Sequence, residues 1–229
     1  MLCLLSLLDA LCPTNCAACD APAEFDGLCF ACGEEVPNRL SPMAAPPDSV
    51  RSGWFLGPYA GPVGALVKRA KYGRQDALLR VIGERVGRAA GALHADVIIP
   101  VPSTHVRRMT RGFDAPDIIA AAVSRSTGVP VLHALTRTRH EAQAGHAHAD
   151  RAANARRGWL ATREIRGRVL LIDDVLTTGS TARACADELI GAGARRVDLL
   201  VAAATSSALD ARVSKNFDNV GEIERRARA

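Results

Sequence analysis

The sequence contains little lysine and few aromatic residues. Only three lysines stand beside twenty-six arginines, and Phe, Trp and Tyr together make up 4% of the 229 residues. The preference for arginine is typical of a GC-rich genome, and the scarcity of aromatic rings weakens the case for a surface that stacks many bases. Hydrophobic residues nevertheless account for 48% of the chain. This is enough for one substantial domain with a small appendage, and it excludes a chain that is disordered throughout.

A long apolar run is also missing. The first thirteen residues, MLCLLSLLDALCP, are apolar but include Asp9 and no basic residue. They therefore lack the positively charged N-terminal region of a secretory signal, and they are too short to span a bilayer. We expect a helix whose leucines pack on the body of the protein, no membrane span, and a cytoplasmic location.

Charge is distributed unevenly along the chain. Residues 1–50 carry a net charge of −6, residues 51–172 carry +12 and residues 173–229 carry −1, for a total of +5. A basic middle indicates a phosphorylated small molecule or a nucleic acid as the partner, although a merely solvated surface would have the same composition.

Cysteine is concentrated at the beginning of the chain. Two CxxC pairs, Cys16 with Cys19 and Cys29 with Cys32, are separated by nine residues. They can place four thiolates around one Zn²⁺ with no open position, which is the arrangement of a structural site. So small a segment has almost no core, and metal binding could supply about 10 kcal/mol of its folding free energy. Redox pairs and plain buried thiols are the alternatives, and Cys12 could replace Cys16 as a ligand.

Apolar and turn-forming residues divide the chain into four parts. Residues 1–40 are predicted to form the initial helix and the four-cysteine zinc module, and residues 41–53 a proline-rich linker. Residues 54–206 form the main domain, and residues 207–229 a polar tail.

Strands alternate with amphipathic helices in the main domain. We expect strands within residues 53–61, 95–102, 129–137, 168–173 and 195–204, and helices at residues 62–73, 76–93, 115–128 and 179–192. Asp114 is the expected N-cap of the third helix. The alternation predicts an α/β fold, in which a mostly parallel sheet is flanked by helices on both faces.

Two adjacent acids, Asp173 and Asp174, follow a buried strand at the end where parallel sheets bind ligands. A turn of small residues then leads into a helix: Thr177, Thr178, Gly179, Ser180 and Thr181. The helix N-terminus offers free N–H groups, and the glycine lets the backbone approach an anion, so the turn predicts a phosphate cradle. No Gly-Lys-Ser/Thr follows, which excludes a Walker loop. The carboxylates would repel the phosphate held by the turn, so they must face hydroxyls or a divalent cation. Ribose 5-phosphate fits both requirements, because it carries a phosphate at one end and a pair of hydroxyls a few ångströms away.

The segment VLLIDDVLTTGST resembles the phosphoribosyl-diphosphate (PRPP) signature of type I phosphoribosyltransferases. The resemblance implies that Asp173 and Asp174 contact the ribose hydroxyls, directly or through Mg²⁺, and that residues 177–181 hold the 5-phosphate. In such enzymes diphosphate leaves C1 of the ribose through an oxocarbenium-like transition state. Purine-salvage members carry an aspartate where Thr177 stands, so purine salvage is not expected here.

Further motifs resemble one branch of these proteins, the competence protein F (ComF/GntX) family, from residue 1 to about residue 204. Besides the leucine-rich start and the two CxxC pairs, the matching positions are Lys71-Tyr72, Val101-Pro102, RGFD at 111–114, Gln143, Arg151 and Asn154. Membership would imply a role in natural competence, with competence proteins as partners and the basic middle on single-stranded DNA.

The resemblance also assigns the basic loop at residues 103–112. It would be the diphosphate loop, with Arg107, Arg108 and Arg111 aimed at the leaving group and Lys71 as a further candidate. Residues 137–157 would form a lid that excludes water.

Three functions are open at this point: a PRPP- and Mg²⁺-dependent transferase with an unnamed acceptor, a single-stranded DNA-binding competence factor without turnover, and a regulatory protein that senses PRPP.

Overall fold

The computed structural model describes residues 15–16, 18–24, 28–103, 109–137 and 158–206. The expected initial helix, part of the basic loop, most of the expected lid and the polar tail lie outside the described residues. The strands are β1 Ser41–Pro42, β2 Gly53–Pro58, β3 Val97–Pro100, β4 Leu135–Arg137, β5 Trp159–Ala161, β6 Arg168–Leu176 and β7 Arg196–Ala204. The helices are α2 Phe30–Glu34, α3 Pro62–Gly73, α4 Asp76–Ala89, the 3₁₀ turn η1 Ala90–Ala92, α6 Ala115–Thr127 and α8 Ser180–Gly191.

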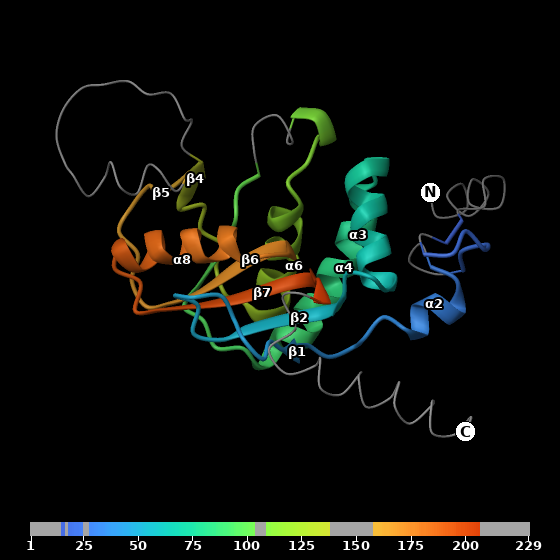
Figure 1. Cartoon of the computed structure of the whole chain (residues 1–229), viewed down its shortest axis with the longest axis horizontal. Helices are drawn as coiled ribbons and strands as arrows, with labels where there is room; N and C mark the ends of the chain where they lie inside the picture. The colour runs from blue at the N-terminus through green and yellow to red at the C-terminus, as the bar shows by residue number, and fades with distance from the viewer. Residues whose placement is uncertain (1–14, 17, 25–27, 104–108, 138–157, 207–229) are drawn as a thin grey trace, which may run out of the picture.

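A five-stranded sheet in the order β1-β2-β7-β6-β3 forms the centre of the molecule (Figure 1). Strands β2, β7, β6 and β3 run parallel, and only the edge strand β1 is antiparallel. The predicted α/β class and the mostly parallel sheet are therefore confirmed. No helix among the described residues combines the length and the apolar character needed to cross a membrane.

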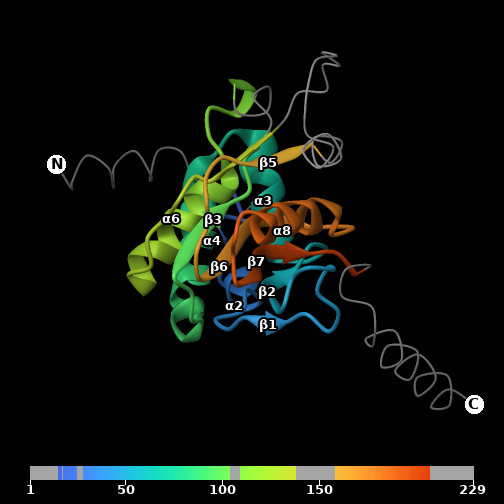
Figure 2. The same ribbon diagram turned by 90° about the vertical axis from the view of Figure 1, so that its left-hand side faces the viewer.

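Helices cover both faces of the sheet, as the sequence predicted. Helices α3, α4 and α6 pack on one face, and α8 with the small β4–β5 sheet packs on the other (Figure 2). The central strand β6 contributes to both cores, since Leu170 and Ile172 belong to one apolar cluster while Val169 and Leu171 belong to the other. Side chains alternate across a strand, so an uninterrupted apolar run is needed where both faces are covered.

Strand β6 is longer than predicted. It was expected to end at the acid pair, but Val175 and Leu176 continue it and pair with Ala203 and Ala204 of β7. The acids consequently lie inside the strand, close to its carboxyl end, where the backbone of β7 fixes their direction.

Residues 129–137 do not form one long strand. Val131 makes a single parallel bridge to Ile98 of β3, and the chain then leaves the central sheet. Its last three residues form β4, which pairs antiparallel with β5. The expected strand is thus divided between two sheets, and β5 was not anticipated.

The segment 41–53, expected as a linker, lies against the domain. It contributes β1 to the sheet edge, and Met43 and Val50 are buried in the core. The Ser49 hydroxyl donates a hydrogen bond to the Asp187 carboxylate of α8. Prolines do keep regular structure short here, but the segment is attached at several points.

Candidate ligand-binding site and metal centre

A cavity of about 300 Å³ opens at the carboxyl ends of the parallel strands. It collects side chains from α3, β6, the loop before α6 and the β4–β5 sheet. Its charged walls are Lys71, Arg111, Arg137, Asp173 and Asp174. Four of these five residues were selected from the sequence as site residues, and the fold brings them together.

The acid pair is tied to α3. Lys71 Nζ lies 2.6 Å from Asp174 Oδ2, and the two side chains are only 16% and 12% exposed. The Asp174 backbone N–H donates to Asp173 Oδ1 at 2.8 Å. Burial, followed by the nearby charge of Asp174, raises the pKa of Asp173 to about 8. Two buried carboxyl groups this close do not readily ionise together, so the pair marks a point where an added cation would be stabilised.

The turn after β6 encloses a second, smaller hollow of about 40 Å³. Asp173, Thr177 and Thr181 line both this hollow and the larger cavity. Apart from a 3.4 Å contact between the Ser180 amide and the Thr178 hydroxyl, no described side chain caps α8, so N–H groups of its first turn are left for a ligand. The turn is therefore able to hold an anion next to the acids.

Glycine is required at the start of α8. Gly179 is the N-cap residue with φ of +74°, and a Cβ atom there would lie 2.7 Å from Pro47 Cγ. Both the left-handed backbone and the close approach of the 41–53 segment exclude a larger residue. The Thr178 and Ser180 hydroxyl oxygens lie 3.0 Å apart beside it.

The basic loop is described only at its two ends. Arg107 and Arg108 lie outside the described residues, whereas Arg111 lines the cavity with its guanidinium 5.9 Å from the centre of the Tyr72 ring. Asp114 is the N-cap residue of α6, as predicted, but its side chain makes no capping hydrogen bond to the helix. Its carboxylate instead accepts hydrogen bonds from the Ser103 amide at 3.0 Å and the Ser103 hydroxyl at 2.7 Å. This contact closes the loop that carries Arg111.

Three aromatic rings line the cavity: Tyr59, Tyr72 and Trp159. Tyr72 is 76% exposed, while Trp159 is buried with the Arg137 guanidinium 5.1 Å from its ring centre. Burial raises the pKa of Tyr59. Sequence reasoning assigned no role to Tyr59 or Trp159. Tyr59 directly follows the carboxyl end of β2, so the rule that selected the acids could also have selected it.

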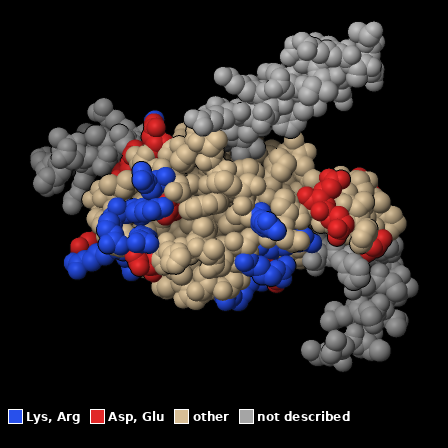
Figure 3. Space-filling model, turned by 90° about the horizontal axis from the view of Figure 1, so that it is seen from below, with Lys and Arg blue, Asp and Glu red and all other residues tan. Residues whose placement is uncertain are grey.

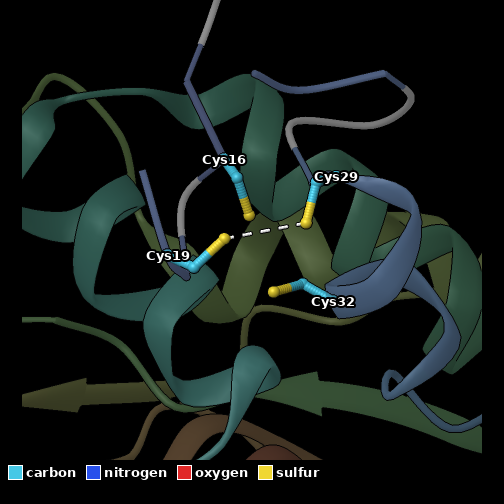
Figure 4. A group of neighbouring side chains, drawn as sticks. All are labelled: Cys16, Cys19, Cys29 and Cys32. Carbon is cyan, nitrogen blue, oxygen red and sulfur yellow. Dashed lines mark hydrogen bonds between the residues drawn. The ribbon is translucent and has the colours of Figure 1, made fainter. Parts of the chain in front are cut away.

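The four cysteines of the CxxC pairs converge on one point (Figure 4). Their Sγ atoms all lie within 4.8 Å of one another, and those of Cys19 and Cys29 are 3.6 Å apart. Sulfur atoms around a tetrahedral zinc ion, with Zn–S of about 2.3 Å, stand about 3.8 Å apart. Burial would raise the pKa of the Cys16 thiol, but backbone N–H groups, first that of Cys29, outweigh it and lower the pKa to about 6. The cluster could hold a metal ion such as zinc; Cys12 lies outside the described residues.

Arginines of the main domain hold the Cys module in place. Arg69 of α3 donates from Nη1 to the Cys16 carbonyl and to Asp20, each at 3.1 Å. Arg85 of α4 donates to the Val36 carbonyl at 3.3 Å. Part of the basic middle of the sequence is thus used for attachment.

Comparison with known proteins found relatives along most of the chain, although no family model matches it. It is 30% identical over 206 residues to the DNA utilization protein YhgH of Escherichia coli O157:H7, covering 80% of this chain and 87% of that protein. It is 29% identical over 182 residues to competence protein F of Haemophilus influenzae, covering 72% of this chain and 80% of that protein.

Two solved structures are also similar. The glutamine PRPP amidotransferase from B. subtilis complexed with ADP and GMP is 25% identical over 54% of this chain, with a TM-score of 0.41. The present chain spans 25% of that protein's length. Orotate phosphoribosyltransferase from Aeropyrum pernix is 18% identical, with 58% of this chain and 62% of that chain covered and a TM-score of 0.35. Scores this low carry no argument about activity.

Proposed function

This chain belongs to the family of competence protein F and the DNA utilization protein YhgH, and from that premise we propose that it binds PRPP with Mg²⁺ and transfers the phosphoribosyl group to an acceptor during DNA uptake or utilization. One observation carries the proposal. A small hollow at a helix N-terminus and a larger cavity lined by two acids and several bases share a wall at Asp173. An anion and a diol on one ligand need such a pair of neighbouring spaces.

The ligand would lie across both spaces. The 5-phosphate sits in the turn at residues 177–181, where backbone amides and hydroxyls donate hydrogen bonds. The ribose hydroxyls face Asp173 and Asp174, which would repel the phosphate. The diphosphate points to Lys71 and Arg111, with Arg107 and Arg108 of the same loop as further cations.

The acid pair suits Mg²⁺, because two carboxylates offer the hard oxygen ligands that this ion takes in proteins. When bound, Mg²⁺ would neutralise diphosphate charge and orient the ribose. The chain's own part in transfer is to hold the sugar at both ends and to stabilise the departing diphosphate, which is the role of Lys71 and Arg111.

The acceptor would enter on the aromatic side of the cavity. Tyr72 and Trp159 line it, each with an arginine near its ring, and rings of this kind suit a flat acceptor. For the four-cysteine cluster we propose a structural Zn²⁺ held by Cys16, Cys19, Cys29 and Cys32, with no part in the reaction.

The second candidate function is single-stranded DNA binding without turnover, in line with the name of one relative, the DNA utilization protein YhgH. The basic middle of the sequence, however, does not form one surface. Lys71 and Arg111 line the cavity, whereas Arg69 and Arg85 hold the Cys module. A DNA-binding surface therefore has to be sought among other residues.

Calorimetric titration with PRPP in the presence and absence of Mg²⁺ tests the main proposal. Asp173→Asn combined with Asp174→Asn should weaken Mg²⁺-dependent binding at least about 100-fold, since two charge-assisted contacts of about 1.5 kcal/mol each are lost. Asp76→Asn, which changes an exposed acid of α4, is the matched control.

Unchanged affinity in the double variant, with an unchanged melting temperature, would refute the assignment of the acids. Release of diphosphate on addition of candidate bases or amines tests the transfer. If PRPP binds but no acceptor causes diphosphate release, the protein would be a PRPP sensor and not an enzyme.

A further inference from the structure

A row of arginines lies at the amino ends of the parallel strands, at the opposite end of the sheet from the cavity. Arg51 precedes β2, Arg196 begins β7 and Arg168 begins β6. The Arg51 amide donates to the Val197 carbonyl at 2.8 Å, and Arg168 is the register partner of Arg196. Neighbouring strands are about 4.8 Å apart, so these positions, with Arg195 beside them, form a continuous cationic edge.

Two hollows flank Arg195. One, of about 410 Å³, is lined by Ser49, Val50, Arg51, Ile190, Arg195 and Arg196. The other, of about 480 Å³, includes Leu93, His94, Asp96, Val129, Arg168 and Arg195. Their described linings together contain four arginines and one acid, with apolar side chains between the charges. We call this area the amino-end surface.

Within the part of the chain that the structure describes, most of these arginine charges form no ion pair that would stabilise the fold. Arg51, Arg168 and Arg195 are exposed, and none of them takes part in an ion pair among the described residues. Arg196 is different, because its Nε lies 2.8 Å from an Asp198 carboxylate oxygen. Like charges held this close repel one another, so the row is explained better by an anionic ligand than by stability of the fold.

Figure 3 shows where the charges lie on one face of the molecule. Lys and Arg side chains gather at its left-hand end, with several acids among them, and again right of centre, beside acidic side chains at the right (Figure 3). That left-hand end is where β6 and β7 begin (Figure 1). Basic side chains are thus present at the end of the sheet where the amino-end surface lies.

We propose that the amino-end surface binds the backbone of single-stranded nucleic acid, with one phosphate on Arg195 and the two flanking nucleosides in the hollows. The guanidinium fork matches phosphate oxygens in a bidentate manner, and its flat face can stack on an unpaired base. A duplex keeps its bases stacked inside and would leave the hollows unused. A membrane surface would need cations on a convex face, whereas here they border two hollows.

The surface is separate from the proposed PRPP site. Strand β6 has nine residues, and at about 3.3 Å per residue it spans about 30 Å between the two ends of the sheet. A single-stranded DNA bound to the amino-end surface would therefore leave the cavity accessible. DNA and PRPP should then bind at the same time.

Fluorescence anisotropy with a labelled oligothymidylate tests the surface. Arg51→Glu combined with Arg195→Glu should weaken binding at least about tenfold at low salt and should reduce the salt slope by about 0.7, since the phosphate contact of Arg195 is lost. Arg39→Glu combined with Arg80→Glu changes net charge equally through exposed arginines outside the two hollows, and it should bind nearly as well as wild type. If the glutamate variant misfolds, Arg51→Gln with Arg195→Gln gives the same test with a smaller expected loss.

Equal binding by the two double variants would overturn the proposal. So would displacement of the oligonucleotide by PRPP with Mg²⁺, equal affinity for a duplex of the same length, or binding to anionic lipid vesicles in its place. PRPP titration of Arg51→Glu with Arg195→Glu should be unchanged, and oligonucleotide binding by Asp173→Asn with Asp174→Asn should be unchanged. The experiments can thus refute nucleic-acid binding at the amino-end surface and PRPP binding in the cavity independently of each other.

Discussion

The Cys module and the turn between β6 and α8 are both encoded by short motifs, but different forces hold them in shape. In the module, α2 has no buried residue, and of the residues described between 15 and 40 only Cys16, Leu28 and Val36 belong to the buried core. The turn follows a strand that is apolar on both faces, and Gly179 is pressed against Pro47. We therefore expect the module to depend on a bound metal ion for its fold, whereas the turn has its shape without a ligand.

Removal of metal should separate the two regions most strongly. Zinc binding contributes about 10 kcal/mol to folding in comparable Cys-rich peptides, so a chelator or Cys29→Ser should unfold the module while the sheet persists. Metal analysis should give one zinc per chain before treatment and none after it. Limited proteolysis should then cut within residues 15–40.

Cys185→Ala provides the control, because this thiol is on the buried face of α8 and its loss should leave the zinc content unchanged. Full protection of residues 15–40 in metal-free protein would show that the module's contacts with the main domain, among them those of Arg69 and Arg85, are enough to hold it without metal.

Gly179→Ala should disturb the turn without unfolding the domain. The left-handed backbone costs a residue with a Cβ about 1–2 kcal/mol, and the new atom meets Pro47. We expect PRPP affinity to fall at least about tenfold, measured by calorimetry. Gly128→Ala is matched closely, because φ is +73° there and no atom lies within 4 Å of the added Cβ.

The Gly128 variant should lose similar stability and keep its PRPP affinity. An equal loss of affinity in both variants would mean that general destabilisation, and not the shape of the turn, governs binding.

The last expected effect is a pH dependence of stability. The folded protein holds the Asp173 proton up to about pH 8, while the unfolded chain releases it near 3.8. The folded state binds more protons between these values, so the free energy of unfolding should fall as pH rises towards about 8 and level off above it, by at most about 1.4 kcal/mol per unit. Urea denaturation at about pH 6 and about pH 8 measures it. The same slope in Asp173→Asn would assign the effect to another group.

Much of the site could be predicted from the sequence because its signals are local. The acids, the glycine turn and the CxxC pairs are each contiguous in the chain, and the regular alternation of strands and helices places the first two at one edge of the sheet. The helices of residues 62–73 and 179–192 were predicted to within a residue or so, since proline and glycine mark their ends.

The parts that could not be predicted depend on distant partners. Val175 and Leu176 extend β6 only because β7 offers Ala203 and Ala204. Trp159 reaches the cavity because β5 pairs with β4, about twenty residues away along the chain. Asp114 is the predicted N-cap residue of α6, but its carboxylate binds Ser103, a contact that a local capping rule does not contain.

The attachment of residues 41–53 determines where this protein can be cut. A shortened fragment that begins at residue 54 would retain every strand of the parallel sheet apart from the first residue of β2. It would nevertheless lose Pro47 from beside Gly179, and Ser49 from its hydrogen bond with Asp187. A fragment intended for crystallisation or ligand screening should therefore begin before residue 41, or the turn at residues 177–181 will have lost the Pro47 side chain that packs beside it.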